Sequence, residues 1–456
     1  MAALVAPHHR KILHLSRPLI ISRRSSKMNK ALPQHHPAVG VHNLHPRSLP
    51  IFSFVLFMLC FSISGTYAQS NLNIYGYFSY EMEKSWNHPR LNTDESIQRE
   101  YSPASFENHS LNLITQFAMN DNTRFFLSID GKNDKKVAIA NSWGEYSASR
   151  YFTVRFGKTY RKFGLYNELL DAAPTYFGID PPEHFSDEHL LLSRTTAVMI
   201  YGNTDLGTGT FNYSLSTDNG QGIDDSFEKS KPLGWDLNYK WNNNDFTVGF
   251  SGYTSFGDVH SDVEFGGGTP QNGVFPWMAS DKFSVFSGYA EAIFGNLTLQ
   301  AEYVNAPHKG IRDAAKIVDI VSNSTINSAQ RARFLLDPNG SVAEDNVNTA
   351  ANYSINSYYL RAAYTFETAI GQIIPFGWFD YYKNPENIDD EYYGGDGEAG
   401  DTDTGIMGSY TFGIVYRPTS IIAVKIENEN HFMDFNKAGR VYSSDLRLNV
   451  SYVFGQ

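Results

Sequence analysis

The 456-residue chain divides by charge into a basic beginning and an acidic body. Its first 68 residues contain eight of the 37 basic residues and none of the 48 acidic ones, so the other 388 residues have a net charge of −19. A body this acidic lacks the basic surface that binds phosphate backbones, and we expect no nucleic-acid partner. The single cysteine, Cys60, lies in the basic part, which excludes disulfide bonds and thiolate metal sites from the body.

The beginning of the chain has the order of a secretory signal peptide. Arg47 precedes an apolar run at residues 51–63, and small and polar residues then lead to Ala68. The run is shorter than the roughly 20 residues that a membrane-spanning helix needs, so an uncleaved anchor is the less favoured alternative. We expect a leader at 1–68, with Met28 as the translation start, Sec-type export, cleavage before Gln69 and a mature protein at 69–456.

The body alternates between apolar and polar residues with a period of two. In the last segment, Leu446, Leu448 and Val450 alternate with Arg447 and Asn449. This period indicates strands with one apolar and one polar face. The whole body gives about sixteen such strands, predicted at 71–83, 107–119, 122–131, 137–148, 151–159, 194–203, 208–217, 232–242, 245–255, 281–294, 297–305, 353–367, 371–382, 406–417, 420–431 and 441–454.

The connections between these strands alternate in length. Turns of two residues, such as Asn120-Asp121 and Gly295-Asn296, are followed by mostly longer connections. The long connections are predicted at 84–106, 160–193, 256–280, 306–352 and 383–405. Tight turns at one end and long loops at the other are typical of a transmembrane antiparallel β-barrel, with periplasmic turns and extracellular loops. A soluble all-β sandwich, which the composition alone would allow, has no reason to keep its long loops at one end.

Two short segments resemble the bacterial porins, the sixteen-stranded channel family. Residues 71–78, Asn-Leu-Asn-Ile-Tyr-Gly-Tyr-Phe, are similar to a porin's first strand. Residues 154–167, from Val-Arg-Phe-Gly-Lys through Leu-Tyr-Asn, are similar to the strand that leads into a porin's third loop. The resemblance implies a Gram-negative outer-membrane channel for passive diffusion of small polar solutes and ions. It also implies that loop 160–193 folds into the lumen and narrows it.

The resemblance further implies a set of partners. These are outer-membrane lipid and lipopolysaccharide, the barrel-assembly machinery, small polar solutes and a homotrimeric assembly. The assembly machinery reads a terminal aromatic residue in this family, and here Phe454 is followed by Gly455 and Gln456. We expect no cofactor.

Charged residues on the predicted inner faces are candidates for lining and narrowing the pore. Basic wall residues facing acidic residues of loop 160–193 would set a transverse field across the lumen. The alternative is that these charges only pin the loop to the wall. The candidates are Arg124, Arg155, Lys158, Arg161, Lys162, Glu168, Asp171, Asp180, Glu183, Arg361, Lys425, Glu427 and Arg447.

The loop at 389–405 is densely acidic. Its oxygen ligands could bind Ca²⁺, but the twelfth position counted from Asp401 is Phe412, which excludes an EF-hand. A solvated loop is the simpler interpretation.

Two other functions remain as alternatives to a channel. No Gly-x-Ser-x-Gly, His-Glu-x-x-His or Gly-Lys-Ser motif is present in the sequence, so a barrel enzyme has no focused catalytic motif. An adhesin or receptor would act through the long loops 306–352 and 383–405. Conductance in a planar bilayer separates a channel from both.

Overall fold

The computed structural model describes most of the chain after residue 70. The described residues are 71–91, 96–132, 136–170, 172–185, 195–218, 231–241, 245–261, 263–267, 273–395 and 397–455. The predicted leader, its cleavage site and the start at Met28 lie outside them. Among the described residues, no helix is both long enough and apolar enough to cross a membrane.

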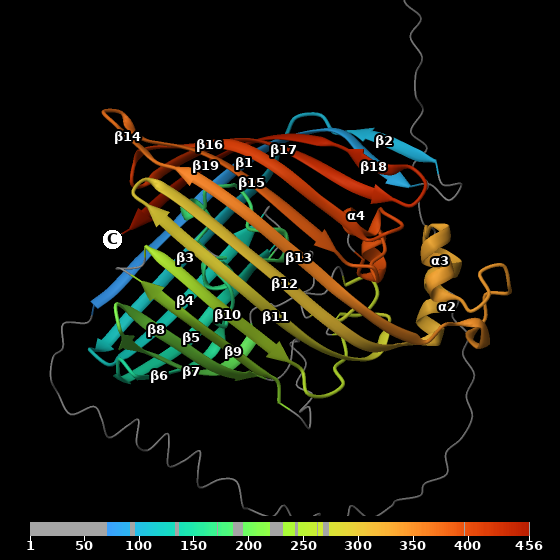
Figure 1. The fold of residues 1–456 in the computed structure, drawn as a ribbon, viewed down its shortest axis with the longest axis horizontal. Helices are drawn as coiled ribbons and strands as arrows, with labels where there is room; N and C mark the ends of the chain where they lie inside the picture. Colours follow the sequence, from blue (N-terminus) through green and yellow to red (C-terminus); the bar gives the residue numbers. More distant parts are fainter. Residues whose placement is uncertain are drawn as a thin grey trace, which may run out of the picture. The chain divides into compact units, whose positions relative to one another are not determined.

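Sixteen strands of the described chain form the wall of a closed antiparallel barrel (Figure 1). They are β1 Asn71–Leu91, β3 Ser105–Asn120, β4 Thr123–Lys132, β5 Lys136–Ser149, β6 Phe152–Thr159, β7 Thr195–Leu206, β8 Gly209–Asp218, β9 Leu233–Trp241, β10 Phe246–Thr254, β11 Met278–Phe294, β12 Leu297–Arg312, β13 Ala350–Tyr364, β15 Gly371–Lys383, β16 Ile406–Thr419, β17 Ile422–Phe435 and β19 Ser444–Gly455.

The barrel closes because its first strand pairs with its last. β1 pairs with β3 on one side and with β19 on the other, and Tyr80 lies opposite Val450 in the second pairing. A closed barrel pairs the backbone polar groups of every strand and leaves no open edge, which lipid requires. The predicted all-β transmembrane barrel of about sixteen strands is therefore confirmed.

Short elements extend this wall or lie in its connections. They are β2 Ile97–Tyr101, β14 Phe366–Thr368, β18 Gly439–Tyr442, η1 Asn167–Leu169, η2 Ala173–Thr175, η3 Glu183–Phe185, α2 Ala314–Asn323, α3 Ser328–Phe334, η5 Glu344–Asn346, η6 Glu391–Tyr393 and α4 Gly397–Gly400. Tight turns alternate with mostly longer connections, and we call the two ends of the barrel the turn end and the loop end. In the tight turn before β12, Gly295 adopts a positive φ of 60°, which glycine tolerates without strain.

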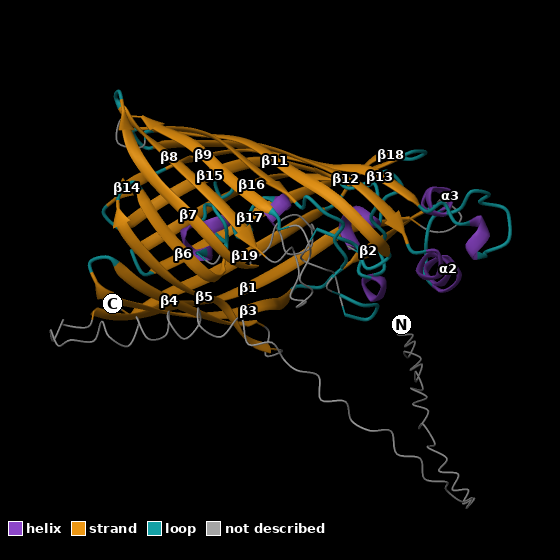
Figure 2. Cartoon of the chain, turned by 90° about the horizontal axis from the view of Figure 1, so that it is seen from below, coloured by secondary structure: helices purple, strands orange, loops and turns teal. Residues whose placement is uncertain are grey.

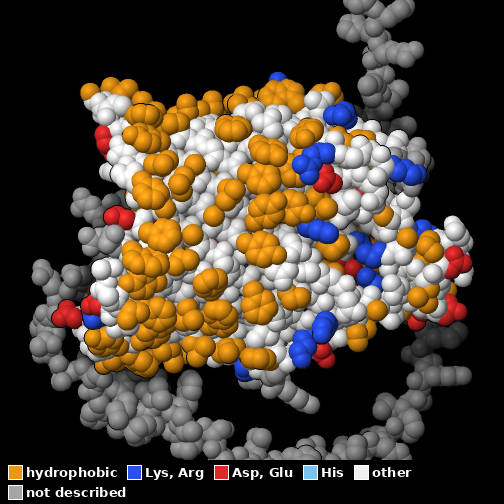
Figure 3. Space-filling model, in the orientation of Figure 1, with side chains coloured by type: hydrophobic (Ala, Val, Ile, Leu, Met, Phe, Trp, Pro, Cys, Tyr) orange, Lys and Arg blue, Asp and Glu red, His pale blue; other side chains and the backbone are white. Residues whose placement is uncertain are grey.

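The two faces of the wall differ as the alternation predicts. Val450 on β19 is 41% exposed, whereas its neighbours Asn449 and Ser451 are buried on the inner side. Figure 3 shows apolar side chains spread over the outer surface of the strands. So large an exposed apolar surface on a closed barrel indicates contact with lipid.

Several strands are longer than the alternation indicated, and one loop contains helices that were not predicted. β1 continues to Leu91 and pairs with β2, and β12 continues to Arg312. Loop 306–352 contains α2 and α3, although its polar composition suggested a loop without helices. Asp313 caps α2 by accepting hydrogen bonds from two backbone N–H groups of its first turn.

These helices belong to a folded cap at the loop end. Ile317 of α2 and Phe334 of α3 are buried in one apolar cluster with Trp277 from the loop before β11. Arg312 at the end of β12 and Glu386 in the loop after β15 are joined by a buried pair of hydrogen bonds, each 2.7 Å long. The cap is therefore held by packing and by a bidentate ion pair.

Candidate functional site: the lumen and its third loop

Loop 160–193, the third connection at the loop end, lies against the inner face of the wall. Gly164 donates its backbone N–H to Ser251 of β10 (2.9 Å), and Ile179 donates its N–H to Glu427 of β17 (3.0 Å). The Lys425 ammonium donates to the Gly178 carbonyl at 2.7 Å. Figure 2 shows loop and short helical segments inside the ring of strands. The described part of loop 160–193 thus enters the lumen.

The loop packs tightly against the wall at Gly178. A Cβ atom at this position would lie 1.4 Å from the indole ring of Trp378 on β15. Only glycine fits so close an approach.

A buried Ser–His–Glu arrangement also joins the loop to the wall. His184 Nδ1 lies 3.0 Å from Ser357 Oγ, and His184 Nε2 lies 3.9 Å from Glu302 Oε1. These residue types could form a catalytic triad. Ser357 is only 1% exposed, however, so its hydroxyl cannot meet a substrate in this structure. We interpret the contact as an anchor for the loop.

Five charged residues form a basic cluster near the start of the loop. Arg155 of β6 lies 2.9 Å from Glu145 of β5 and 3.4 Å from Glu168 of the loop. Lys162 contacts Glu168 at 2.6 Å, and Arg124 of β4 donates its Nε–H to Glu145 at 3.1 Å. The loop carboxylate is therefore paired with wall and loop cations.

The electrostatics of this cluster keep Glu168 ionised. Burial raises the pKa of the Glu168 carboxyl, but Lys162 and Arg155 together lower it by more, so the pKa lies below its ordinary value. Glu168 is still partly exposed, at 36% of its side chain.

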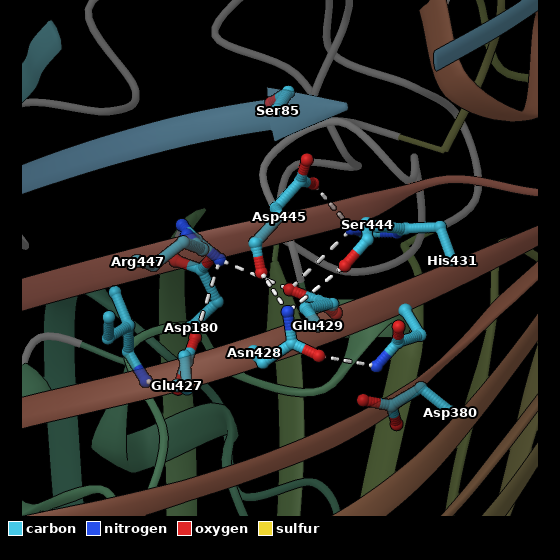
Figure 4. Close-up of polar contacts among 12 residues, drawn as sticks. Ser85, Asp180, Asp380, Glu427, Asn428, Glu429, His431, Ser444, Asp445 and Arg447 are labelled. Atoms are coloured by element: carbon cyan, nitrogen blue, oxygen red, sulfur yellow. Dashed lines mark hydrogen bonds and ion pairs between the residues drawn. The ribbon is translucent and has the colours of Figure 1, made fainter. Parts of the chain in front are cut away.

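Five carboxylates of the described residues contact Arg447 on the side of β1 that pairs with β19. Figure 4 shows Asp180, Glu427 and Glu429 close to it. Arg447 of β19 lies 2.6 Å from Glu81 of β1 and 3.3 Å from Glu429 of β17, and it also contacts Asp180 of the loop. His431 lies 2.8 Å from Asp445 at the edge of this group. We call it the acidic cluster, comprising Glu81, Glu83, Asp180, Glu427, Glu429 and Asp445 around Arg447 and His431. Its carboxylates outnumber its basic side chains.

The remaining predicted site residues have different positions. Arg161 is 1% exposed and pairs with Asp218 beneath the Tyr253 ring, and Arg361 is buried against Asp380 at 3.3 Å. These two charges are therefore neutralised by buried partners, and they do not face an open lumen. Glu183 begins η3 beside the wall, and Asp171 lies outside the described residues.

The prediction that Lys158 faces the lumen is wrong. Lys158 is the cross-strand partner of Ser142 and Thr196. Arg155 and Gly157 are an odd number of residues away from it, so they lie on the opposite face of the strand. Lys158 lies two residues after Phe156, which is 59% exposed on the outer face, so Lys158 is on the outer face as well. The prediction grouped Lys158 with Arg155, although an interval of three residues in a strand joins opposite faces.

Several residues of the two clusters were not among the candidates. Glu81 and Glu83 follow Ser79 at intervals of two in the first strand, so alternation could have placed them on the inner face. Glu145 was harder to assign because the alternation of its strand is interrupted. The pairing of Glu81 with Arg447, 366 residues away, has no signal in a single sequence.

The acidic loop 389–405 is engaged by basic side chains. Arg90 lies 2.5 Å from Asp389, and His88 lies 3.1 Å from Asp401, so both contacts come from the extension of β1. Burial, opposed by the His88 hydrogen bond, raises the pKa of Asp401 to about 6. Among the described residues, no three His, Cys, Asp or Glu side chains are grouped so that they could hold a metal ion.

Among known proteins, the matches to this chain are solved structures. No protein-family model matches the chain, and no curated protein matches its sequence. The outer membrane channel DcaP of Acinetobacter baumannii is 12% identical with a TM-score of 0.49, covering 86% of this chain and 100% of its own. The anion-selective porin from Comamonas acidovorans is 11% identical with a TM-score of 0.48, covering 84% of this chain and 100% of its own. Salmonella typhi OmpF in complex with daunomycin is 12% identical with a TM-score of 0.47, covering 84% of this chain and 97% of its own.

The class of protein is defined by the barrel itself. A closed antiparallel barrel with an apolar outer face and a polar inner face is a transmembrane β-barrel. Identities this low assign no functional residue, so we argue the function from the side chains of this chain.

Proposed function

We propose that the protein is an outer-membrane channel of the porin type that passes small polar solutes and ions by diffusion. The observation that supports this most is loop 160–193, whose described part lies inside a closed barrel with a charged inner face. A water-filled channel needs no catalytic group, because pore width and the charges lining the pore determine what passes. In this proposal the loop is the constriction, and the bacterium is Gram-negative with Sec-type export of the mature protein.

The charges support a division of roles between the clusters. Arg155 is 12% exposed and lies between Glu145 and Glu168, so much of its charge is neutralised. Asp180, in contrast, is 53% exposed and extends from the loop to the acidic cluster. We infer that the acidic cluster attracts cations near the constriction.

A swelling assay tests solute passage directly. Liposomes containing the folded protein are diluted into isotonic solutions of sugars of increasing size. The proposal expects rapid swelling with small sugars and a steep decline with size, whereas liposomes with heat-unfolded protein stay closed. Equal behaviour of the two preparations with every sugar would overturn the channel.

A receptor is the second candidate, and the folded cap favours it. Buried Trp277 and the Arg312–Glu386 ion pair give the loop end a defined surface, as a binding protein requires. The same assay separates the two functions, because a receptor with a closed lumen would give no swelling.

A further inference from the structure

Two lysines lie directly opposite each other on the outer face of the barrel. Lys282 of β11 and Lys309 of β12 are cross-strand partners, and both are exposed. Their neighbours Asp281 and His308 point inward and contact each other at 2.7 Å, which leaves the lysines on the outer side. Like charges in directly opposed positions repel each other. Among the described carboxylates, none forms an ion pair with either lysine.

A strip of amide and hydroxyl side chains continues from the lysines along the same face. Asn352 of β13 is the cross-strand partner of Lys309. Further along, Asn305 donates through Nδ2 to Ser354 Oγ and to Asn356 Oδ1, each at 2.8 Å. Polar groups on the lipid side of a barrel are costly unless they meet a polar partner. Figure 3 shows Lys and Arg side chains gathered between the apolar surface and the end that carries α2 and α3.

An apolar depression lies on the same strands, farther from the loop end. Its volume is about 500 Å³, within the range of small-molecule sites. Small residues on the outer face form its floor, and large ones form its rim. They are Gly288, Ala290 and Ala301 on the floor, and Phe250, Tyr303 and Leu360 on the rim.

The spacing between the lysines and the depression suits a lipid molecule. Ala301 and Lys309 are eight residues apart on one strand, or roughly 27 Å at about 3.4 Å per residue. With a strand tilt of roughly 40°, the difference in depth is about 20 Å. The rim of the depression at Tyr303 is six residues from Lys309, or about 16 Å in depth, and one half of a membrane core is about 15 Å thick. The end of an acyl chain whose headgroup lies at the lysines would therefore reach this edge of the depression.

We propose that this surface is a binding site for a phosphorylated lipid of the leaflet at the loop end. The phosphate lies between Lys282 and Lys309, the amide strip contacts the polar part of the headgroup, and one acyl chain fills the depression. The anion relieves the repulsion between the two ammonium groups. The inference rests on the membrane orientation of the barrel and is independent of solute passage.

Native mass spectrometry of the folded protein in detergent tests the site. The probe is dioleoyl phosphatidic acid, with dioleoylglycerol and inorganic phosphate as the two comparison ligands. We expect K282Q/K309Q to bind the probe at least tenfold more weakly than the wild type. The control K84Q/K158Q removes two outward lysines that are not cross-strand partners, and it should bind like the wild type.

A second variant tests whether the depression binds the acyl chain of the lipid. A301F fills the depression and should weaken binding of dioleoyl phosphatidic acid, while binding of the dihexanoyl analogue stays unchanged. Equal affinities of K282Q/K309Q and its control would overturn the proposal. So would competition by inorganic phosphate at the concentration of the lipid, because the site would then bind a free anion. Sugar-driven swelling should be the same for all three variants, which keeps failure of this site distinct from failure of the channel.

Discussion

Arg447 is the residue on which the acidic cluster depends most. It contacts Glu81, Glu429 and Asp180 together, and its side chain is only 10% exposed. Removing a cation from a buried network leaves its carboxylates uncompensated, which costs more than the ion pairs themselves contribute.

The substitution R447Q should therefore destabilise the barrel by about 3–5 kcal/mol. Urea unfolding of the folded protein in detergent measures this change. R447K is the matched control, since it keeps the charge but loses the planar fork that contacts several carboxylates, and it should have an intermediate effect. If R447Q unfolded at the same urea concentration as the wild type, the cluster would contribute little to the fold.

Asp401, which lies outside the membrane-spanning strands, should make the free energy of unfolding depend on pH. Its folded pKa of about 6 lies above the value near 4 of an unfolded aspartate. Between these values the folded chain binds a proton that the unfolded chain does not, so lowering the pH through this window favours the folded chain.

The variant D401N lacks this titration. The free energy of unfolding of the wild type, relative to that of D401N, should therefore rise as the pH falls from 7 to 4. Urea midpoints of the two proteins, measured in parallel across this range, give the difference. A constant difference, or one that falls with decreasing pH, would contradict a raised pKa for Asp401.

At the scale of single elements, β19 tests the depth of the barrel in the membrane. Val450 and Leu446 both lie on its outer face, but Leu446 is near the loop end. An arginine facing lipid costs roughly 2–4 kcal/mol near the midplane and about 0–1 kcal/mol near the interface. V450R should thus lower the free energy of unfolding much more than L446R, as measured by urea titration in lipid vesicles. Equal losses would mean that the two positions do not differ in depth.

The strands could be predicted because lipid imposes a strict requirement on each of them. Outward positions within the membrane core, such as Val450 and Phe156, are mostly apolar, and one residue of slip would reverse every side chain. The predicted strands 137–148 and 194–203 are confirmed as β5 and β7. The alternation in β5 is interrupted by a local bulge, where the register with β4 shifts between Ser128 and Ile129.

The helices in loop 306–352 were missed because composition dominated the prediction there. Ile317, Ile320 and Val321 have helical spacing, and Asn327 with Gln330 forms a capping box at the start of α3. Both signals are present in the sequence. Seven to ten residues flanked by Asn, Asp and Ser nevertheless look like a polar loop when no packing partner is known.

At the scale of the whole molecule, the barrel was predictable and its charge network was not. Alternation assigns a charged residue to the inner face, but its partner depends on which strands become neighbours. Arg161 pairs with Asp218, and Arg447 pairs with Glu81, only once the barrel has formed. The sequence therefore identified several residues of both clusters without showing which charges would be neutralised.

The central claim is that the barrel is a channel narrowed by loop 160–193, and single-channel recording in a planar bilayer tests it most directly. The wild type should give stepwise, ohmic conductance. Deleting 168–188 should raise the unit conductance, because the loop would no longer occupy the lumen, whereas deleting 337–341 in the cap should leave it unchanged. A wild type that gives no steps, or two deletions that change the unit conductance equally, would contradict the account.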